Sequence, residues 1–157
     1  MSVDIVLEHL YIVVSAMVIA IIIGLPLGIL AYFLRSFRKV IFWIVDIMQT
    51  IPALALLGII MVFLGAGKLT VIIGLFFYSL LPIVQNTCLG LTEVDPAIKE
   101  AAQGMGMTKL YSLVRVELPL AFPVIFTGIR IATVTAIGVA VFATFVGGGG
   151  LGSIIYR

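Results

Sequence analysis

The sequence predicts an all-α, polytopic membrane protein, and three observations support this prediction. Of its 157 residues, 63% are hydrophobic and 10% are charged, with a mean hydropathy of +1.35, so the chain is far more apolar than a soluble domain. Four apolar runs are each long enough to cross a hydrocarbon core, which takes roughly 20 residues of helix. Polar or glycine-rich segments separate these runs. We therefore expect one transmembrane domain over residues 1–157.

The four predicted spans differ in their polar content. They are residues 10–34, 40–64, 69–91 and 120–146. The first and third contain no charged residue, whereas Asp46 lies in the second and Arg130 in the fourth. Breakage of a span into two half-spans at Pro52 or Pro82 is an alternative, because re-entrant segments are tolerated where protein covers them.

The basic residues predict the orientation in the cell membrane. Residues 92–119 are the only long polar segment, and placing it in the cytoplasm puts most basic residues inside: Arg35, Arg38, Lys39, Lys99, Lys109 and Arg115. Only Lys68 and Arg157 then lie outside. The positive-inside rule therefore predicts a cytoplasmic segment 92–119, an external N-terminus and an external tetraglycine at residues 147–150.

Composition excludes several classes of function. Cys88 is the only cysteine, so neither a disulfide framework nor a cysteine-based metal site is expected. A net charge of +2, scattered along the chain, argues against nucleic acid as a partner. One histidine and seven acidic residues provide no catalytic set and no metal-ligand cluster in a plausible pocket. We expect neither enzymatic activity nor a bound cofactor or metal.

Two glycine-rich stretches fail the tests for phosphate binding. Residues 65–70 have leucine where a phosphate-binding loop needs Ser or Thr after the lysine. Gly147, Gly149 and Gly152 match G-x-G-x-x-G, but they follow an apolar helical run and not a strand. We expect a flexible external turn at residues 147–150, with tight backbone packing against the translocation path as the alternative. His9, near the same end, is expected to lie at the membrane interface.

Segment 92–119 has the pattern of a helix, a glycine turn and a second helix. Asp95 followed by Pro96 is typical of a helix start, because the carboxylate accepts free backbone N–H groups and proline presets φ. Gly104 and Gly106 are expected to end this helix. Thr108 can cap the second helix, which Pro119 is expected to close.

The spacing of residues in this segment resembles a known family motif. It places Glu-Ala-Ala, a glycine four positions later and an aliphatic-x-Leu-Pro sequence ten positions beyond, which is similar to the EAA motif of ABC importer permeases. Val116 replaces the commoner isoleucine. The resemblance implies a coupling helix that docks on an ATP-binding subunit, through Glu100, Ala101, Ala102, Gly104, Gly106, Leu118 and Pro119. An amphipathic helix lying in the headgroup region is the alternative.

Three further stretches resemble the osmoprotectant branch of this family, whose substrates are glycine betaine, carnitine and choline. They are residues 49–55, 76–83 and 147–152. The resemblance implies two ATP-binding cassette subunits that hold ATP and Mg, a second permease copy or paralogue, and an extracellular or periplasmic substrate-binding protein or fused binding domain. Permeases of this branch continue through at least one further span, so the chain is expected to be part of a longer protein.

Polar residues within the predicted spans are candidates for lining a translocation path. They are Gln49, Thr50, Pro52, Tyr78, Ser79 and Asn86. Such residues can equally serve only to hold helices together. A buried ion pair between Asp46 and Arg130 is a further hypothesis, because either charge alone is costly in lipid; snorkelling of Arg130 is its alternative. Gly24 and Gly28, on either side of Pro26, predict close helix packing, with a moving hinge as the alternative.

Other functions remain open at this point. The chain could serve a related ABC importer for another small solute, such as an amino acid or an amino-acid betaine. An ion-coupled carrier would need titratable groups near mid-membrane, for which Asp46 and Arg130 are the only charged candidates. A membrane scaffold could use the same cytoplasmic helices to hold a partner. Neither the carrier nor the scaffold predicts the EAA spacing.

Overall fold

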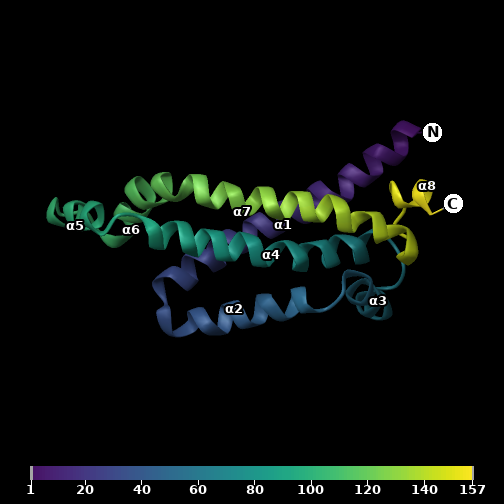
Figure 1. Cartoon of the computed structure of the whole chain (residues 1–157), viewed down its shortest axis with the longest axis horizontal. Coiled ribbons are helices and arrows are strands. Elements are labelled where there is room, and N and C mark those ends of the chain that lie inside the picture. The colour runs from purple at the N-terminus through teal and green to yellow at the C-terminus, as the bar shows by residue number, and fades with distance from the viewer. Residues whose placement is uncertain (1, 157) are drawn as a thin grey trace.

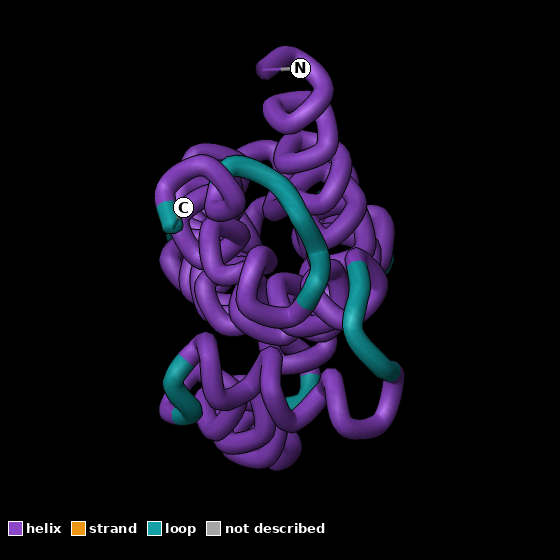
Figure 2. Tube along the Cα trace, turned by 90° about the vertical axis from the view of Figure 1, so that its right-hand side faces the viewer, coloured by secondary structure: helices purple, strands orange, loops and turns teal. Residues whose placement is uncertain are grey.

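The computed structural model describes residues 2–156, and all regular secondary structure in that range is helical (Figure 1). The α-helices are α1 (Ser2–Phe33), α2 (Arg35–Thr50), α3 (Ala53–Leu64), α4 (Lys68–Glu93), α5 (Pro96–Gly104), α6 (Lys109–Ser112), α7 (Leu118–Val139) and α8 (Gly152–Ile155). A π-helical turn, η1 (Leu113–Glu117), precedes α7, and a 3-10 helix, η2 (Ala140–Val146), follows it. Seen end-on, the helices are joined by short loops (Figure 2).

The bundle is built around α4, with α1 and α7 beside it and α2 and α3 against its remaining side (Figure 1). Small and aliphatic side chains fill the core between these helices, including Ala16, Leu75, Ile83 and Ala136. Large apolar side chains such as Ile22, Phe126 and Val134 point outward and are exposed. An apolar exterior around a packed interior is what a bundle solvated by lipid requires.

Gly28 brings α1 into backbone contact with α4. A Cβ atom at Gly28 would lie 2.5 Å from Cβ of Thr87 and 2.9 Å from the carbonyl oxygen of Val84. At Gly24 a Cβ would lie 2.8 Å from Ile83. The predicted packing role of these two glycines is confirmed, because only a residue without a side chain allows this approach.

The second apolar run bends sharply at Pro52. Helix α2 ends at Thr50, α3 begins at Ala53, and the two helices meet at an angle of 98°. Ile51 adopts an extended conformation (φ −77°, ψ 127°), as a residue before proline prefers. Residues 40–64 are therefore not one straight helix, and the alternative of a break at Pro52 describes them. Pro82 lies inside the continuous helix α4.

Side chains satisfy backbone groups beside both prolines. Pro82 cannot donate to the carbonyl four residues earlier, on Tyr78, and Gln49 Nε2 donates to that oxygen at 2.7 Å. In return, the hydroxyl of Tyr78 donates to the carbonyl of Ile51 at the break between α2 and α3. This reciprocal pair joins α2 to α4 and compensates for both irregularities in the backbone.

Pro119 does not end a helix, contrary to the prediction from sequence. The helix that begins at Lys109 continues to Val146 over 38 residues. Since proline lacks an N–H and its ring clashes with the carbonyl of residue 115, the backbone widens into the π-turn η1, in which Leu118 N donates to the carbonyl of Leu113. The fourth span therefore reaches back into the predicted cytoplasmic segment.

Three helices of the described chain are long and apolar enough to cross a membrane, and the bent pair α2–α3 can supply a fourth span. The turn between α1 and α2 lies at the same end of the molecule as α5 and α6, whereas α3, α8 and both termini lie at the other (Figure 1). The segments predicted to be external and those predicted to be cytoplasmic thus gather at opposite ends.

Candidate functional site

Helix α5 is a short helix that projects beyond the bundle (Figure 1). It begins as its sequence predicts, because Asp95 accepts a hydrogen bond of 2.8 Å from the backbone N–H of Ala97 and Pro96 occupies the first helical position. Thr108 caps the following helix by accepting from the N–H of Tyr111 at 3.3 Å. Both predicted caps are therefore present.

Gly106 ends α5 in a left-handed conformation, with φ +81°. Met107 N donates to the carbonyl of Ala102 at 3.1 Å, and Gly106 N donates to that of Gln103 at 2.9 Å. This pair of bonds is a Schellman motif, in which glycine is favoured because it has no Cβ. The predicted glycine turn is confirmed.

Most residues that match the EAA motif face outward at this end of the molecule. Glu100, Ala101, Gly104 and Gly106 are exposed, whereas Ala102 is buried. Met105 and Leu110, at 70% exposure each, flank the glycine turn. The result is a projecting surface of small and apolar residues with one carboxylate, which suits close contact with a partner.

The Leu-Pro end of the motif lies elsewhere. Leu118 is half-buried and Pro119 is exposed, and both line an apolar groove of about 570 Å³ between α1, α4 and α7. They are not part of the projecting surface. Pro119 instead shapes the backbone of η1, which carries Glu117.

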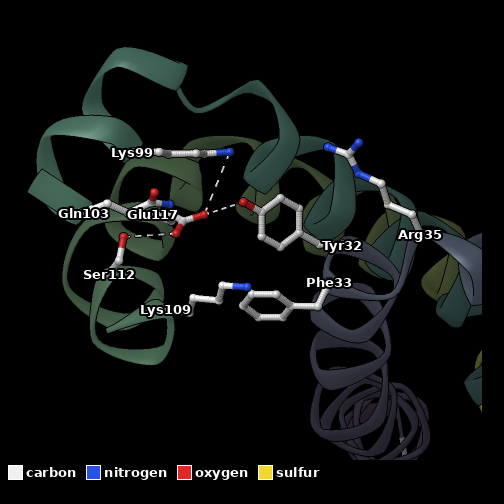
Figure 3. Close-up of a pocket in the computed structure, with 8 residues that line it drawn as sticks. All are labelled: Tyr32, Phe33, Arg35, Lys99, Gln103, Lys109, Ser112 and Glu117. Carbon is white, nitrogen blue, oxygen red and sulfur yellow. Dashed lines mark hydrogen bonds and ion pairs between the residues drawn. The ribbon is translucent and has the colours of Figure 1, made fainter. Parts of the chain in front are cut away.

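Beneath α5 lies a buried polar group that we call the Glu117 cluster, formed by Tyr32, Lys99, Ser112 and Glu117 (Figure 3). Glu117 is 6% exposed. Its carboxylate accepts hydrogen bonds from Tyr32 Oη at 2.6 Å and from Ser112 Oγ at 3.2 Å, and Lys99 Nζ lies 3.9 Å away. Burial of a carboxylate is favourable only with such partners.

Lys99 connects the cluster to further elements. Its ammonium donates to the carbonyl of Leu91 in the last turns of α4 at 2.7 Å and lies 5.0 Å from the centre of the Tyr32 ring. The C-terminal end of a helix favours a cation. Arg35 and Lys109 line the same pocket, of about 230 Å³, so this end of the molecule is rich in basic groups.

The Glu117 cluster was not predicted from the sequence. Glu117 could have indicated a buried polar site, because it is a carboxylate among apolar residues. These are Leu113, Val114, Val116 and Leu118. Tyr32 is 85 positions away in the chain, and no local pattern connects the two residues.

A third concave site lies between α2, α4 and α7. It is a groove of about 320 Å³ that brings together three path candidates, Gln49, Tyr78 and Asn86, with Gln85 and Thr135. No charged side chain lines it. Two of its members also have structural roles, since Gln49 and Tyr78 bond to backbone carbonyls across helices.

The other path candidates are not in this groove. Thr50 and Pro52 are exposed at the bend, and Thr50 Oγ1 donates to the carbonyl of Ile47 at 2.7 Å. Ser79 is 1% exposed, and within residues 2–156 its hydroxyl has no hydrogen-bond partner. It points into the protein interior.

The structure does not join Asp46 to Arg130. Both side chains are exposed, and no ion pair links these two described residues. The described ion pairs that the structure does form are Lys68–Glu8, at 2.7 Å, and Lys99–Glu117.

The tetraglycine is a packed turn, and the expectation of a flexible one is wrong. Gly150 N donates to Glu8 Oε2 at 3.1 Å, and Gly67 N donates to the carbonyl of Val146 at 2.8 Å. Gly149, with φ +74°, leaves no room for a Cβ beside Glu8. His9 is 2% exposed below this turn, so its side chain faces the protein interior.

Comparisons with known proteins agree with the motif. Residues 11–157 match the family model described as "Binding-protein-dependent transport system inner membrane component". The chain is 48% identical over 150 residues to the glycine betaine/carnitine/choline transport system permease protein OpuCD of Bacillus subtilis (strain 168), with 96% of this chain and 66% of that protein covered. It is 42% identical over 151 residues to the osmoprotectant import permease protein OsmY of Salmonella typhimurium, with 95% and 64% covered.

A solved structure supports the fold. In an inward-facing form of the MetNI methionine ABC transporter, one chain superimposes with a TM-score of 0.87 at 28% identity, covering 98% of this chain and 78% of that one. The chain spans about two thirds of the length of the curated relatives. Because the family model covers nearly all of it, the chain belongs to the binding-protein-dependent transport system inner membrane components, the ABC importer permeases that its EAA motif predicts.

Proposed function

We propose that this chain is the membrane-spanning part of a permease subunit in an ABC importer for small quaternary-ammonium osmoprotectants such as glycine betaine, choline or carnitine. The observation that carries the proposal is the projecting helix α5, which presents Glu100, Ala101 and the left-handed turn at Gly106 on an exposed surface. The substrate class comes from the relatives at 42–48% identity, which are named as permeases for these osmoprotectants.

The proposed assembly contains several partners of this chain. Two ATP-binding cassette subunits hold ATP and Mg and receive α5, while a second permease copy or paralogue completes the path. An extracellular or periplasmic binding protein, or a fused binding domain, delivers the solute. In this arrangement α5 faces the cytoplasm and the N-terminus is external. The chain itself binds no nucleotide.

The uncharged groove between α2, α4 and α7 fits this class of substrate. Its lining of amide, hydroxyl and aromatic groups offers weak contacts to a solute that carries a bulky cation. Passage requires binding that is weak enough to release the solute. An ion-coupled carrier is less well supported, because Asp46 and Arg130 lie outside this groove. An amino-acid importer is the second candidate, and it rests on the structural similarity to the methionine transporter.

The experiment is ATP-dependent uptake of labelled glycine betaine, choline, carnitine and methionine by vesicles that contain the full-length permease with its partner subunits. Gly106→Val is compared with Gly106→Asn, because a β-branched residue resists the left-handed conformation at φ +81°, which Asn tolerates. We expect Gly106→Val to abolish most uptake and Gly106→Asn to retain more of it. If both variants took up solute at the wild-type rate, the coupling role of α5 would be overturned. If the transporter preferred methionine, an amino acid would replace osmoprotectants as the proposed substrate class.

A further inference from the structure

We infer that Glu117 is a positioning residue that makes α5 move together with the ends of α1 and α7, through the Glu117 cluster. This inference rests on the proposed function, since it concerns how a movement of α5 reaches the membrane spans. Its basis is a set of distances, the burial of one carboxylate and the connectivity of its partners.

The partners of Glu117 come from separate elements. Tyr32 belongs to the last turn of α1, Lys99 to α5 and Ser112 to α6, while Glu117 itself ends η1 and leads directly into α7 (Figure 3). Lys99 adds α4 through the carbonyl of Leu91. The buried carboxylate and its lysine partner therefore together connect the projecting helix to three membrane spans.

Lys99 is the polar link between α5 and the rest of the molecule. Within the described chain, Lys99 is the one side chain of α5 that forms a hydrogen bond or ion pair with another element. Glu100 and Gln103 have no such contact in this range and are exposed. Apart from Lys99, α5 is held by apolar contacts, with Ala102 buried at its base. Lys99 therefore adds a directional polar link to the backbone connections and apolar contacts that hold α5.

Glu117 also lies in the π-turn η1, where the backbone departs from regular α-helix. In this turn the regular α-helical bonding of the long helix Lys109–Val146 gives way to a bond between Leu118 N and the carbonyl of Leu113. π-turns often occur at functional sites and allow local rearrangement. The Lys99–Glu117 separation of 3.9 Å also leaves room for this pair to shorten when α5 is pressed toward α7.

The test compares Glu117→Gln, Tyr32→Phe and Lys99→Met in the complete transporter, with Lys109→Met as the control. Lys109 lines the same pocket, but it has no hydrogen bond or ion pair to Glu117 in the described chain. We expect assembly and ATP hydrolysis to persist, while the solute taken up per ATP falls about 2- to 30-fold in the three variants, the range seen for residues that carry coupling. The Tyr32→Phe/Glu117→Gln double variant should be no worse than its worse single variant. The control should match wild type.

A second measurement tests the inference without a transport assay. Backbone hydrogen exchange is measured on the purified complex. In Glu117→Gln, both α5 and the last turn of α1 should exchange faster than in wild type. In Lys109→Met, neither region should change. The inference would be overturned if solute uptake and ATP hydrolysis fell in the same proportion. It would also be overturned if hydrogen exchange changed in only one of the two regions. If the wild-type complex imports no solute, the proposed function fails, and the exchange result still decides whether Glu117 joins the two helices.

Discussion

Gly28 shows how a single residue determines the spacing between two helices in this bundle. The missing side chain lets α1 approach the backbone of α4 at Val84, and any larger residue would collide with Thr87. In lipid, where the hydrophobic effect does not drive helix association, such close van der Waals packing is a main source of stability.

Replacement of Gly28 by leucine should therefore destabilise the bundle by about 1–3 kcal/mol, the usual cost of overpacking. The measurement is the thermal unfolding midpoint of the purified protein in detergent. Gly58→Ala in α3 is the matched control, because a Cβ there meets nothing within 4 Å, and alanine favours a helix by about 1 kcal/mol over glycine. An unchanged midpoint for Gly28→Leu would show that α1 and α4 are not in close contact.

At the scale of elements, the two prolines and their partners determine the shape of the second span. Pro52 separates α2 from α3, and Pro82 leaves a carbonyl of α4 without its helical donor. Gln49 and Tyr78 each supply a hydrogen bond to the backbone of the other helix. The bend is thus a stabilised feature and not a frayed helix.

Removal of the Tyr78 hydroxyl in Tyr78→Phe should cost about 1–3 kcal/mol, because the carbonyl of Ile51 loses its partner in a half-buried place. Tyr11→Phe is the control, since Tyr11 is 60% exposed. The same unfolding assay compares the two variants. Equal midpoints would mean that the bend does not depend on this bond.

At the scale of the whole molecule, the two ends of the bundle are expected to face different compartments. The turn at residues 65–67 lies at one end and α5 at the other (Figure 1). Basic residues concentrate at the α5 end, where Arg35, Lys99 and Lys109 line one pocket. The positive-inside rule predicts that this end is cytoplasmic.

Cysteine labelling tests this orientation directly. In a Cys88→Ala background, a membrane-impermeant maleimide should label Ala66→Cys in intact cells and Gln103→Cys only after permeabilisation, because both positions are exposed at opposite ends. Cys88 is buried, so its replacement removes a background signal at little structural cost. Labelling in the reverse order would show that the topology is inverted and that α5 does not lie in the cytoplasm.

Much of the candidate site was predictable because its determinants are local. The caps at Asp95 and Thr108 and the left-handed turn at Gly106 follow from the chemistry of neighbouring residues. The helix end at Pro119 and the flexible turn at the tetraglycine were predicted wrongly. A proline can end a helix or widen it, and a glycine run can be loose or packed, and the choice depends on surrounding elements that the local sequence does not reveal.

The sequence by itself determined the apolar runs, the helix caps and the EAA spacing, because hydropathy and backbone preferences act over a few residues. Only the tertiary structure decided the 98° bend, the π-turn and the Glu117 cluster. The physical reason is that the free energy of a buried polar group depends on the partners that reach it. For Glu117 one of those partners, Tyr32, lies 85 positions away, and only the packing of α1 against the rest of the bundle brings it there.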